Sequence, residues 1–236
     1  MNPTVSHFDA KHPLGPDCGR LGTGGGSHGT FYLRCMKRIL DFVFALAGLI
    51  LTFPILLICA VAIRLDSQGP VFFRQRRVGK HGRPFEIVKL RSMVDKGEGK
   101  GLKLTASHDS RITRVGKWLR RTKIDEIPQL INVLKGEMSF VGTRPEVPEY
   151  VSAYTNEQRK VFRLKPGITG PASLAFIDEE QVLAARPDAE DFYLKTLLQR
   201  KLDLDLAYCE SVSFLGDVRL ILSTVRRLFG IHKSRR

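Results

Sequence analysis

The longest apolar run in the chain extends from Phe42 to Ile63, and its 22 residues include no charged side chain. At about 1.5 Å per residue, a helix of this length just crosses the hydrocarbon core of a bilayer. Pro54 lies near the middle of the run, where a proline removes a helical hydrogen bond and favours a kink. The run therefore predicts a membrane helix, because a buried core helix is disfavoured at this length.

Basic residues flank this apolar run on both sides. They are Arg34, Lys37 and Arg38 before it and Arg64, Arg74, Arg76 and Arg77 after it. A simple transmembrane span shows an excess of Lys and Arg on one side only. Two basic flanks fit a bent, re-entrant helix that enters and leaves by the same membrane face. The pattern by itself leaves both geometries open, spanning and re-entrant.

The residues after the membrane helix predict a small α+β domain. Val71–Val78 and Phe85–Leu90 have strand patterns, and the "GKHG" between them predicts a hairpin. Helical periodicity marks the segments Arg111–Arg121, Ile127–Leu134, Pro148–Phe162 and Asp188–Tyr208. The first of these would place Ile112, Val115, Trp118 and Leu119 on its apolar side.

Proline and glycine residues complete this prediction by marking the ends of a helix and a turn. Pro128 suits the first turn of the second helix, and Gly136 is expected to end it. The glycines in "KPGITG", Lys165 to Gly170, predict a tight turn.

The C-terminal stretch combines apolar and basic residues with helical spacing. Its apolar side consists of Phe214, Val218, Ile221, Leu222, Val225 and Phe229, and its charged residues include Arg219, Arg226, Arg227, Lys233, Arg235 and Arg236. Such a helix suits the interface of an anionic membrane. An amphipathic helix that faces the core and carries a solvated basic tail is the alternative.

These patterns divide the chain into three parts. Residues 1–30 are rich in Gly, His, Pro and Ser and predict a flexible tail, residues 34–65 a membrane-inserted helix, and residues 66–236 a folded domain. The tail contains a G-x-G-x-x-G match at Gly24, Gly26 and Gly29. We interpret this match as accidental, because no strand precedes it and no amphipathic helix follows.

Charge adds a functional indication. The formal net charge is +14, and residues 64–123 contain 17 Lys or Arg but only 5 Asp or Glu. An anionic partner is therefore expected to meet this part of the chain. The four cysteines and six histidines show no metal-ligand spacing, which argues against a zinc site.

The adjacent acids Asp125 and Glu126 are the first candidates for chemistry. They follow Arg120, Arg121 and Lys123 and precede a helix start, where unpaired backbone N–H groups attract phosphate. A carboxylate there could hold a divalent cation or attack phosphorus as a nucleophile. The alternative is structural, because Thr122-x-x-Asp125 also resembles a helix capping box.

Further basic residues fit the same anionic ligand. "SFVGTRPE", Ser139 to Glu146, offers the planar fork of Arg144 for phosphate, with Gly142 permitting close backbone approach. Lys165 is a second candidate anion contact, and Lys89 and Arg91 on the outgoing hairpin strand could face the same region. Salt-bridged or solvated side chains are the alternative for each of them.

Five motifs in this order carry a resemblance. They are "KRILDFVFALAGLILTFPILL", "GPVFFRQRRVGKHGRPFEIVKLRSM", "LRRTKIDEIPQLINVLKGEMSFVGTRPE", "RLKPGITGPASL" and "LDLDLAYCESVSFLGD". From about Arg34 to Phe229 the chain resembles the bacterial sugar transferase family, the monotopic polyprenyl-phosphate phosphoglycosyl transferases, in its minimal catalytic form.

The resemblance implies a reaction and a location. A sugar phosphate would pass from a UDP-sugar to undecaprenyl phosphate with release of UMP. This is the first membrane step in assembling a surface glycan such as exopolysaccharide, capsule or the O-antigen of lipopolysaccharide, which downstream enzymes extend. The resemblance further implies Mg²⁺ as cofactor and membrane lipid as partner. Residues 66–236 would be a catalytic domain on the cytoplasmic face of the bacterial inner membrane.

The resemblance also implies residue roles. Asp125 would be the nucleophile and a metal ligand, and Glu126 would assist in positioning or proton handling. Phosphate or substrate contacts are expected at Lys89, Arg120, Arg144, Lys165 and Asp205. The membrane helix would break at Phe53-Pro54, where the family has Ser-Pro, and Thr52 could bond back to a carbonyl in place of the serine.

Two other functions remain to be distinguished. A non-catalytic membrane adaptor would explain the charge and the apolar anchor but not the ordered motifs, and no nucleic-acid-binding signature is present. A processive glycosyltransferase would release UDP rather than UMP.

Overall fold

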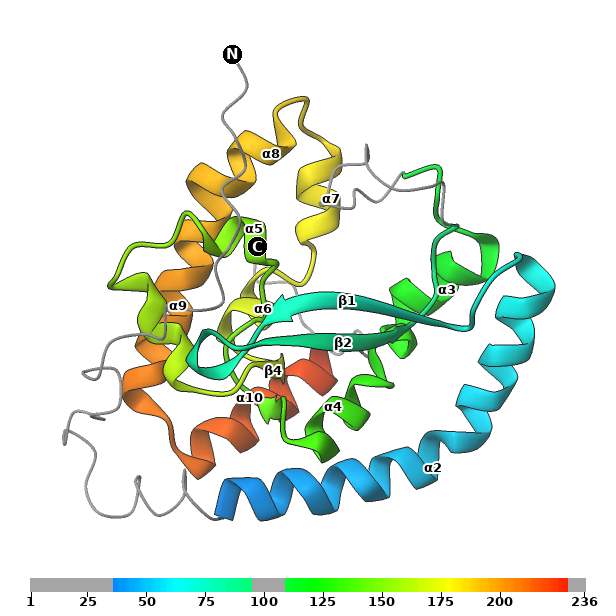
Figure 1. The fold of residues 1–236 in the computed structure, drawn as a ribbon, viewed down its shortest axis with the longest axis horizontal. Helices are drawn as coiled ribbons and strands as arrows, with labels where there is room; N and C mark the ends of the chain where they lie inside the picture. The colour runs from blue at the N-terminus through cyan, green and yellow to red at the C-terminus, as the bar shows by residue number, and fades with distance from the viewer. Residues whose placement is uncertain (1–35, 95–108, 229–236) are drawn as a thin grey trace.

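A computed structural model describes residues 36–94 and 109–228 as a mixed helix-and-strand domain with one long apolar helix along its edge (Figure 1). This confirms the α+β prediction. The expected tail at residues 1–30 and the basic C-terminal residues beyond Leu228 lie outside the described residues. The division into three parts therefore stays a prediction.

The long helix α2, Lys37–Asp66, curves around the domain (Figure 1). Within the described residues, it is the one helix long and apolar enough to cross a membrane. Only 11% of its most apolar 18-residue stretch is buried. Pro54 lies inside it, and the Thr52 hydroxyl donates a 2.6 Å hydrogen bond to the Gly48 carbonyl. This bond confirms the expected hydrogen bond from Thr52 back to a carbonyl of its own helix. A proline inside a helix accounts for the curvature.

Both ends of α2 are fastened to the same folded domain. At the N-terminal end, Arg38 donates to the Val133 and Leu134 carbonyls at 2.5 and 2.8 Å. At the C-terminal end, the Arg91 guanidinium donates to the Ser67 carbonyl at 2.6 Å. The polar contacts thus lie at the two ends of α2, while large apolar residues in its middle, such as Leu51, are exposed.

The predicted hairpin is confirmed. Strand β1, Phe72–Val78, pairs antiparallel with β2, Pro84–Leu90, with Phe72 opposite Leu90 and Val78 opposite Pro84. The short 3₁₀ helix η3, Lys80–Gly82, joins them. The inward residues of β2 help to build the hydrophobic core.

A second, smaller pairing was not expected. Strand β3, Ser139–Val141, runs parallel to β4, Gly167–Thr169. The prediction of a simple turn at "KPGITG" is therefore wrong, because partners distant in sequence turn its middle residues into a strand. A Cβ atom on Gly142 would lie 2.3 Å from the Lys165 carbonyl oxygen. This contact confirms that Gly142 permits close backbone approach.

Helices α3, Arg114–Thr122, and α4, Gln129–Lys135, flank the 3₁₀ helix η4, Ile124–Glu126. Gly136 ends α4 with φ +83°, as predicted. Trp118, expected on the apolar side of α3, is 51% exposed, so that placement is wrong, whereas Leu119 is fully buried. Helical spacing alone does not tell which side of a short helix meets the core.

The segment predicted as one helix from Pro148 to Phe162 is broken. Helix α5 covers Pro148–Val151, and the 3₁₀ helix η5 covers Gln158–Arg163. Between them, Thr155 and Gln158 exchange side-chain-to-backbone hydrogen bonds of 2.9 and 3.2 Å. This reciprocal pair is a capping box, which starts a new helix rather than continuing the previous one.

The remaining helices complete the domain. They are α6 (Pro171–Ala175), α7 (Glu179–Ala184), α8 (Ala189–Phe192), the π-helical η6 (Tyr193–Leu197), α9 (Leu198–Ser211) and α10 (Phe214–Leu228). The run from α8 to α9 confirms the helix expected over Asp188–Tyr208. In α10 the apolar residues Ile221, Leu222 and Val225 are exposed, so the core-facing alternative for this helix is wrong over the described residues.

Candidate active site

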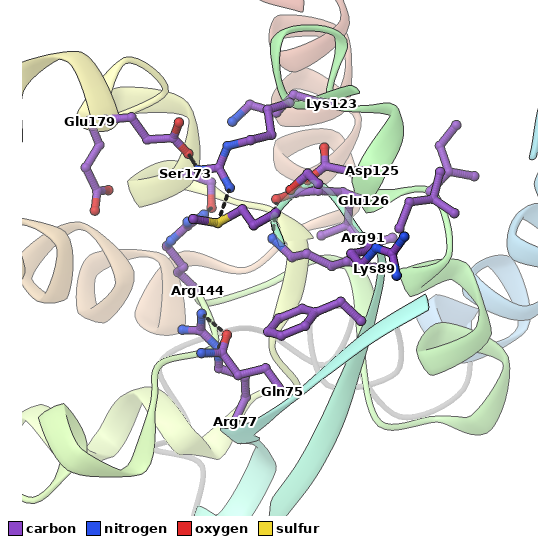
Figure 2. A pocket seen from close by; sticks show the side chains of 18 of the residues that line it. Gln75, Arg77, Lys89, Arg91, Lys123, Asp125, Glu126, Arg144, Ser173 and Glu179 are labelled. Carbon is purple, nitrogen blue, oxygen red and sulfur yellow. Dashed lines mark hydrogen bonds and ion pairs between the residues drawn. The ribbon is translucent and has the colours of Figure 1, made fainter. Parts of the chain in front are cut away.

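A cavity of about 1440 Å³ lies between the hairpin and the helices around it (Figure 2). Its lining comes from β1 and β2, from α3 and η4, from the segment after β3, and from the α6–α7 region. Of the predicted site residues, it brings together Asp125, Glu126, Lys89, Arg120 and Arg144. These predicted catalytic and phosphate-binding residues therefore meet in one cavity.

A chain reversal places the two acids. Helix α3 ends at Thr122, and Lys123 takes the left-handed conformation with φ +57°, which directs the backbone into η4. The Thr122 hydroxyl donates to the Trp118 and Leu119 carbonyls of its own helix. It does not cap the next helix, so the capping-box interpretation of Thr122-x-x-Asp125 is wrong.

Asp125 is buried at the cavity wall, with 5% of its surface exposed. Its Oδ1 atom is buried and accepts no hydrogen bond from the residues that the structure describes. Leaving a buried polar atom unpaired costs about 1–3 kcal/mol, so such atoms are uncommon in stable proteins. An unpaired carboxylate oxygen on a residue that lines a cavity points to a ligand or a reacting group.

Glu126 is held differently. The Lys89 ammonium on β2 donates a 2.7 Å hydrogen bond to Glu126 Oε1, and both side chains are about one-fifth exposed. The predicted anion contact Lys89 is therefore bound to a carboxylate beside the cavity. A phosphate that approaches Asp125 would meet Lys89 next to it.

The two acids have opposite pKa shifts. Burial, with the neighbouring charge of Glu126, raises the pKa of Asp125 to about 6. Although burial opposes ionisation of Glu126 as well, the charges of Lys89, Lys123 and Arg144 lower its pKa to about 2. At pH 7 both are carboxylates, but Asp125 is the more basic and hence the better nucleophile.

Three cations besides Lys89 lie near this pair. Lys123 and Arg144 line the cavity with it (Figure 2). Arg120 lines the cavity as well. Arg120 donates to Glu180 of α7 at 2.5 Å, and Arg144 Nη1 lies 3.5 Å from the Ser173 hydroxyl. These side chains form an electropositive region that suits phosphate groups.

Asp205 does not line the cavity but supports it. It is buried on α9, and its Oδ2 accepts a 2.9 Å hydrogen bond from the backbone N–H of Arg144. Burial raises the pKa of Asp205 to about 6. Asp205 was expected to contact substrate, but its position shows that it holds the backbone of Arg144 in place.

The structure leaves three other predicted residues away from this cavity. Lys165 lies near Gly136 instead, and its Nζ would be 3.5 Å from a Cβ atom added to that glycine. Its charged neighbours include Arg38 and Asp41 at the start of α2. Phe53 and Pro54 belong to the exposed middle of α2. Arg91 does reach the cavity wall, but its guanidinium holds the end of α2.

Several polar residues of the cavity escaped the sequence analysis. Arg77, Glu179 and Tyr193 line it. The sequence marks Arg77 only as part of a basic flank and gives Glu146 no role, whereas Glu179 belongs to "PASLAFIDEEQ", Pro171 to Gln181, a stretch that is a plausible part of a sugar pocket. Ionic groups from distant segments meet here, and no local motif marks such a meeting.

A metal would find limited ligands in this site. The described residues contain no group of three His, Cys, Asp or Glu side chains close enough to bind one ion. The unpaired oxygen of Asp125 nevertheless fits Mg²⁺, which keeps several waters and binds through one or two carboxylates together with substrate phosphates. The donor set is thus compatible with Mg²⁺ that arrives with a phosphorylated substrate.

Comparison with known proteins agrees with this geometry. Residues 32–230 match the family model of bacterial sugar transferases. A UDP-glucose:undecaprenyl-phosphate glucose-1-phosphate transferase of Caulobacter vibrioides is 40% identical over 195 residues, which cover 81% of this chain and 69% of the relative. An uncharacterized sugar transferase of Bacillus subtilis, EpsL, is 36% identical over 82% of this chain and 87% of its own length.

A longer relative is similar over part of its length. The UDP-N-acetylgalactosamine-undecaprenyl-phosphate N-acetylgalactosaminephosphotransferase of Aeromonas hydrophila is 38% identical over 198 residues, which cover 82% of this chain but only 43% of the relative. Residues 32–230, which match the family model, contain all of the residues that line the cavity. The chain belongs to the bacterial sugar transferase family.

Proposed function

We propose that this protein transfers a sugar-1-phosphate from a UDP-sugar to undecaprenyl phosphate and releases UMP. The observation that carries the proposal is the buried Asp125 carboxylate, with one oxygen unpaired, at the wall of a cation-lined cavity. The names of the relatives support the substrate classes, because they specify UDP-sugars and undecaprenyl phosphate. Membership of this family favours an enzyme over a membrane adaptor.

The proposed reaction has two displacements at one phosphorus atom. In the first, an oxygen of Asp125 attacks the sugar-bearing phosphorus, and the bond to the bridging oxygen breaks so that UMP leaves. An acyl-phosphate then links Asp125 to the sugar phosphate. In the second, a phosphate oxygen of undecaprenyl phosphate attacks that phosphorus, and the Asp125 carboxylate is released. The product is undecaprenyl-diphosphate sugar.

The neighbouring residues support these steps electrostatically. Lys89, Arg120, Lys123 and Arg144 would stabilise the negative charge on the diphosphate and on departing UMP. Glu126 would keep Lys89 in place through their 2.7 Å hydrogen bond. Asp205 would orient the backbone at Arg144.

Mg²⁺ would be held by Asp125 together with the phosphate oxygens of the donor. When bound, the ion would offset negative charge on the diphosphate and reduce its repulsion from the carboxylates.

Membrane association follows from α2 and α10 in this proposal. The acceptor carries a long lipid tail, so the cavity must lie next to the bilayer. The docking of both ends of α2 on the same domain supports the re-entrant geometry. By the family resemblance, the domain would lie on the cytoplasmic face of the inner membrane. The exposed apolar side of α10 would contact membrane lipid.

The biological role would be initiation of a surface glycan: exopolysaccharide, capsule or the O-antigen of lipopolysaccharide. Downstream glycosyltransferases would extend the lipid-linked sugar. Relatives act, by their names, on glucose or N-acetylgalactosamine donors, and these two are the first donors to test.

The decisive experiment measures nucleotide release by purified protein in nanodiscs with Mg²⁺, undecaprenyl phosphate and UDP-sugars. We expect UMP, and we expect none from Asp125→Ala. Without the acceptor, mass spectrometry of intact protein should show one added sugar phosphate on the wild type only. Release of UDP would instead indicate a processive glycosyltransferase and would contradict the proposal.

A further inference from the structure

One wall of the cavity is a connected chain of polar side chains that the reaction at Asp125 does not use. We call it the polar wall, and it consists of Gln75, Arg77, Glu146, Tyr193, Lys201 and Glu179. All of these except Lys201 line the cavity. They come from β1, from the segment after β3, and from η6, α9 and α7.

Hydrogen bonds join one member to the next. Arg77 donates to Gln75 Oε1 at 2.7 Å and to Glu146 Oε1 at 2.9 Å. The Tyr193 hydroxyl donates to Glu146 Oε2, and Lys201 Nζ donates to that hydroxyl at 3.2 Å. Lys201 also donates to Glu179 Oε2 at 2.7 Å. The polar wall is therefore built in one fixed arrangement.

Burial makes this arrangement informative. Glu146, Tyr193 and Lys201 are 7%, 2% and 3% exposed. Taking such charges out of water carries a desolvation penalty that an ion pair often fails to recover, and apolar residues of similar size would often be no less stable. A buried ionic chain on the wall of a cavity thus indicates recognition of a ligand rather than stability of the fold.

Arg144 connects the polar wall to the reacting carboxylates. It lies within electrostatic reach of Glu126, Glu179 and Glu146. Figure 2 shows Arg144 between Glu126 and Glu179. A phosphate that contacts Arg144 beside Asp125 would therefore have one of its substituents next to the polar wall.

The charges of the polar wall select the kind of substituent. The carboxylates of Glu146 and Glu179 repel phosphate but accept hydrogen bonds from hydroxyl groups. Because Arg77 holds the amide oxygen of Gln75, the amide nitrogen is left as a donor for a ligand oxygen. A neutral ring with several hydroxyl groups fits this combination of acceptors and donors.

We propose that the polar wall is the subsite for the sugar ring of the donor, with Glu179 and Gln75 as its specificity-determining residues. This inference rests on the proposed transfer from a UDP-sugar and adds the location of the sugar. Because the attacking and leaving oxygens are in line at phosphorus, UMP leaves on the side opposite the Asp125 oxygen, and the nucleoside and the sugar ring occupy different parts of the cavity.

The test compares Glu179→Gln and Gln75→Ala with the wild type and with Glu157→Gln. Glu157 lies on the surface with a 66% exposed side chain and serves as the matched control. For each protein, kcat/KM is measured with UDP-glucose and with UDP-N-acetylgalactosamine, and the inhibition constant is measured for UMP. Gln75→Ala removes a side chain from a two-stranded hairpin at the cavity rim, so it provides a variant that is expected to fold.

We expect each polar-wall variant to lower kcat/KM for the preferred donor by roughly tenfold or more and to change the ratio between the two donors. The UMP inhibition constant should stay within about twofold, because UMP has no sugar ring. An equal loss for both donors with weaker UMP inhibition would place the nucleoside at the polar wall and overturn the inference. Unchanged kinetics in both variants would also overturn it, whereas a wild type that releases no UMP from any UDP-sugar would overturn the proposed function itself.

Discussion

Lys89 Nζ of β2 lies 2.7 Å from Glu126 Oε1 of η4, and this ion pair gives two adjacent carboxylates different electrostatic surroundings. Glu126, with the nearby cations, keeps a low pKa and stays charged, whereas buried Asp125 has a pKa raised to about 6. Two neighbouring acids whose pKa values are pushed apart are typical of active sites.

The first prediction concerns the pH dependence of turnover. In the proposed reaction Asp125 attacks as a carboxylate, so kcat/KM should rise with pH through about 6 as the proton is lost, and level off above pH 7. In Lys89→Met the lost positive charge should move this midpoint upward. The measurement is UMP release between pH 5 and 8, and a wild-type profile that is flat across this range would contradict the role of Asp125.

The second prediction concerns stability. Because folding raises the pKa of Asp125 from 3.8 to about 6, the folded state loses stability as pH rises through this window, and the loss remains above it. Asp125→Asn should therefore abolish turnover yet stabilise the protein at pH 8, by roughly 1–3 kcal/mol, with little gain at pH 4. Thermal melts at the two pH values check this, and equal melting temperatures of variant and wild type at pH 8 would contradict it.

The third prediction concerns Asp205. Asp205→Ala would leave the buried N–H of Arg144 without its acceptor, which costs about 1–3 kcal/mol and frees the loop that carries the guanidinium. We expect a rise in KM for the UDP-sugar and a lower melting temperature. Asp205→Asn keeps an acceptor oxygen and should retain most activity. If Asn and Ala behave alike, the hydrogen bond to Arg144 is not what Asp205 contributes.

The fourth prediction concerns the cation. At the cavity wall Asp125 offers one unpaired carboxylate oxygen, and the described residues contain no group of three metal-binding side chains, so Mg²⁺ should bind weakly without a donor. EDTA should reduce UMP release to the level of Asp125→Ala, and added Mg²⁺ should restore it. Turnover that continues unchanged in EDTA would remove the cation from the proposal.

The fifth prediction concerns the membrane helix. If α2 is re-entrant, cysteines introduced at Met36 and Leu65, both exposed near its ends, should react with an impermeant maleimide from the same side. The four native cysteines would first be changed to serine. Labelling in inverted vesicles but not in spheroplasts is expected for both positions. Labelling from opposite sides would show a spanning helix.

The sequence by itself determined the features that short segments encode. The apolar run, its proline and Thr52 predicted a bent membrane helix, the alternation around "GKHG" predicted the hairpin, and Gly136 marked the end of α4. Each signal lies within a few residues of its effect. The ordered motifs similarly identified Asp125 and Glu126, together with Lys89, Arg120 and Arg144 as their neighbours.

Only the tertiary structure decided how distant segments meet. Lys89 and Glu126 are separated by 37 positions, and Arg144 and Asp205 by 61. The polar wall, the parallel pairing of β3 with β4 and the separation of Lys165 from the cavity depend on such meetings. The same holds for the exposed side of Trp118. Periodicity says which residues share a side of a helix, but burial and charge pairing depend on which other segment covers that side.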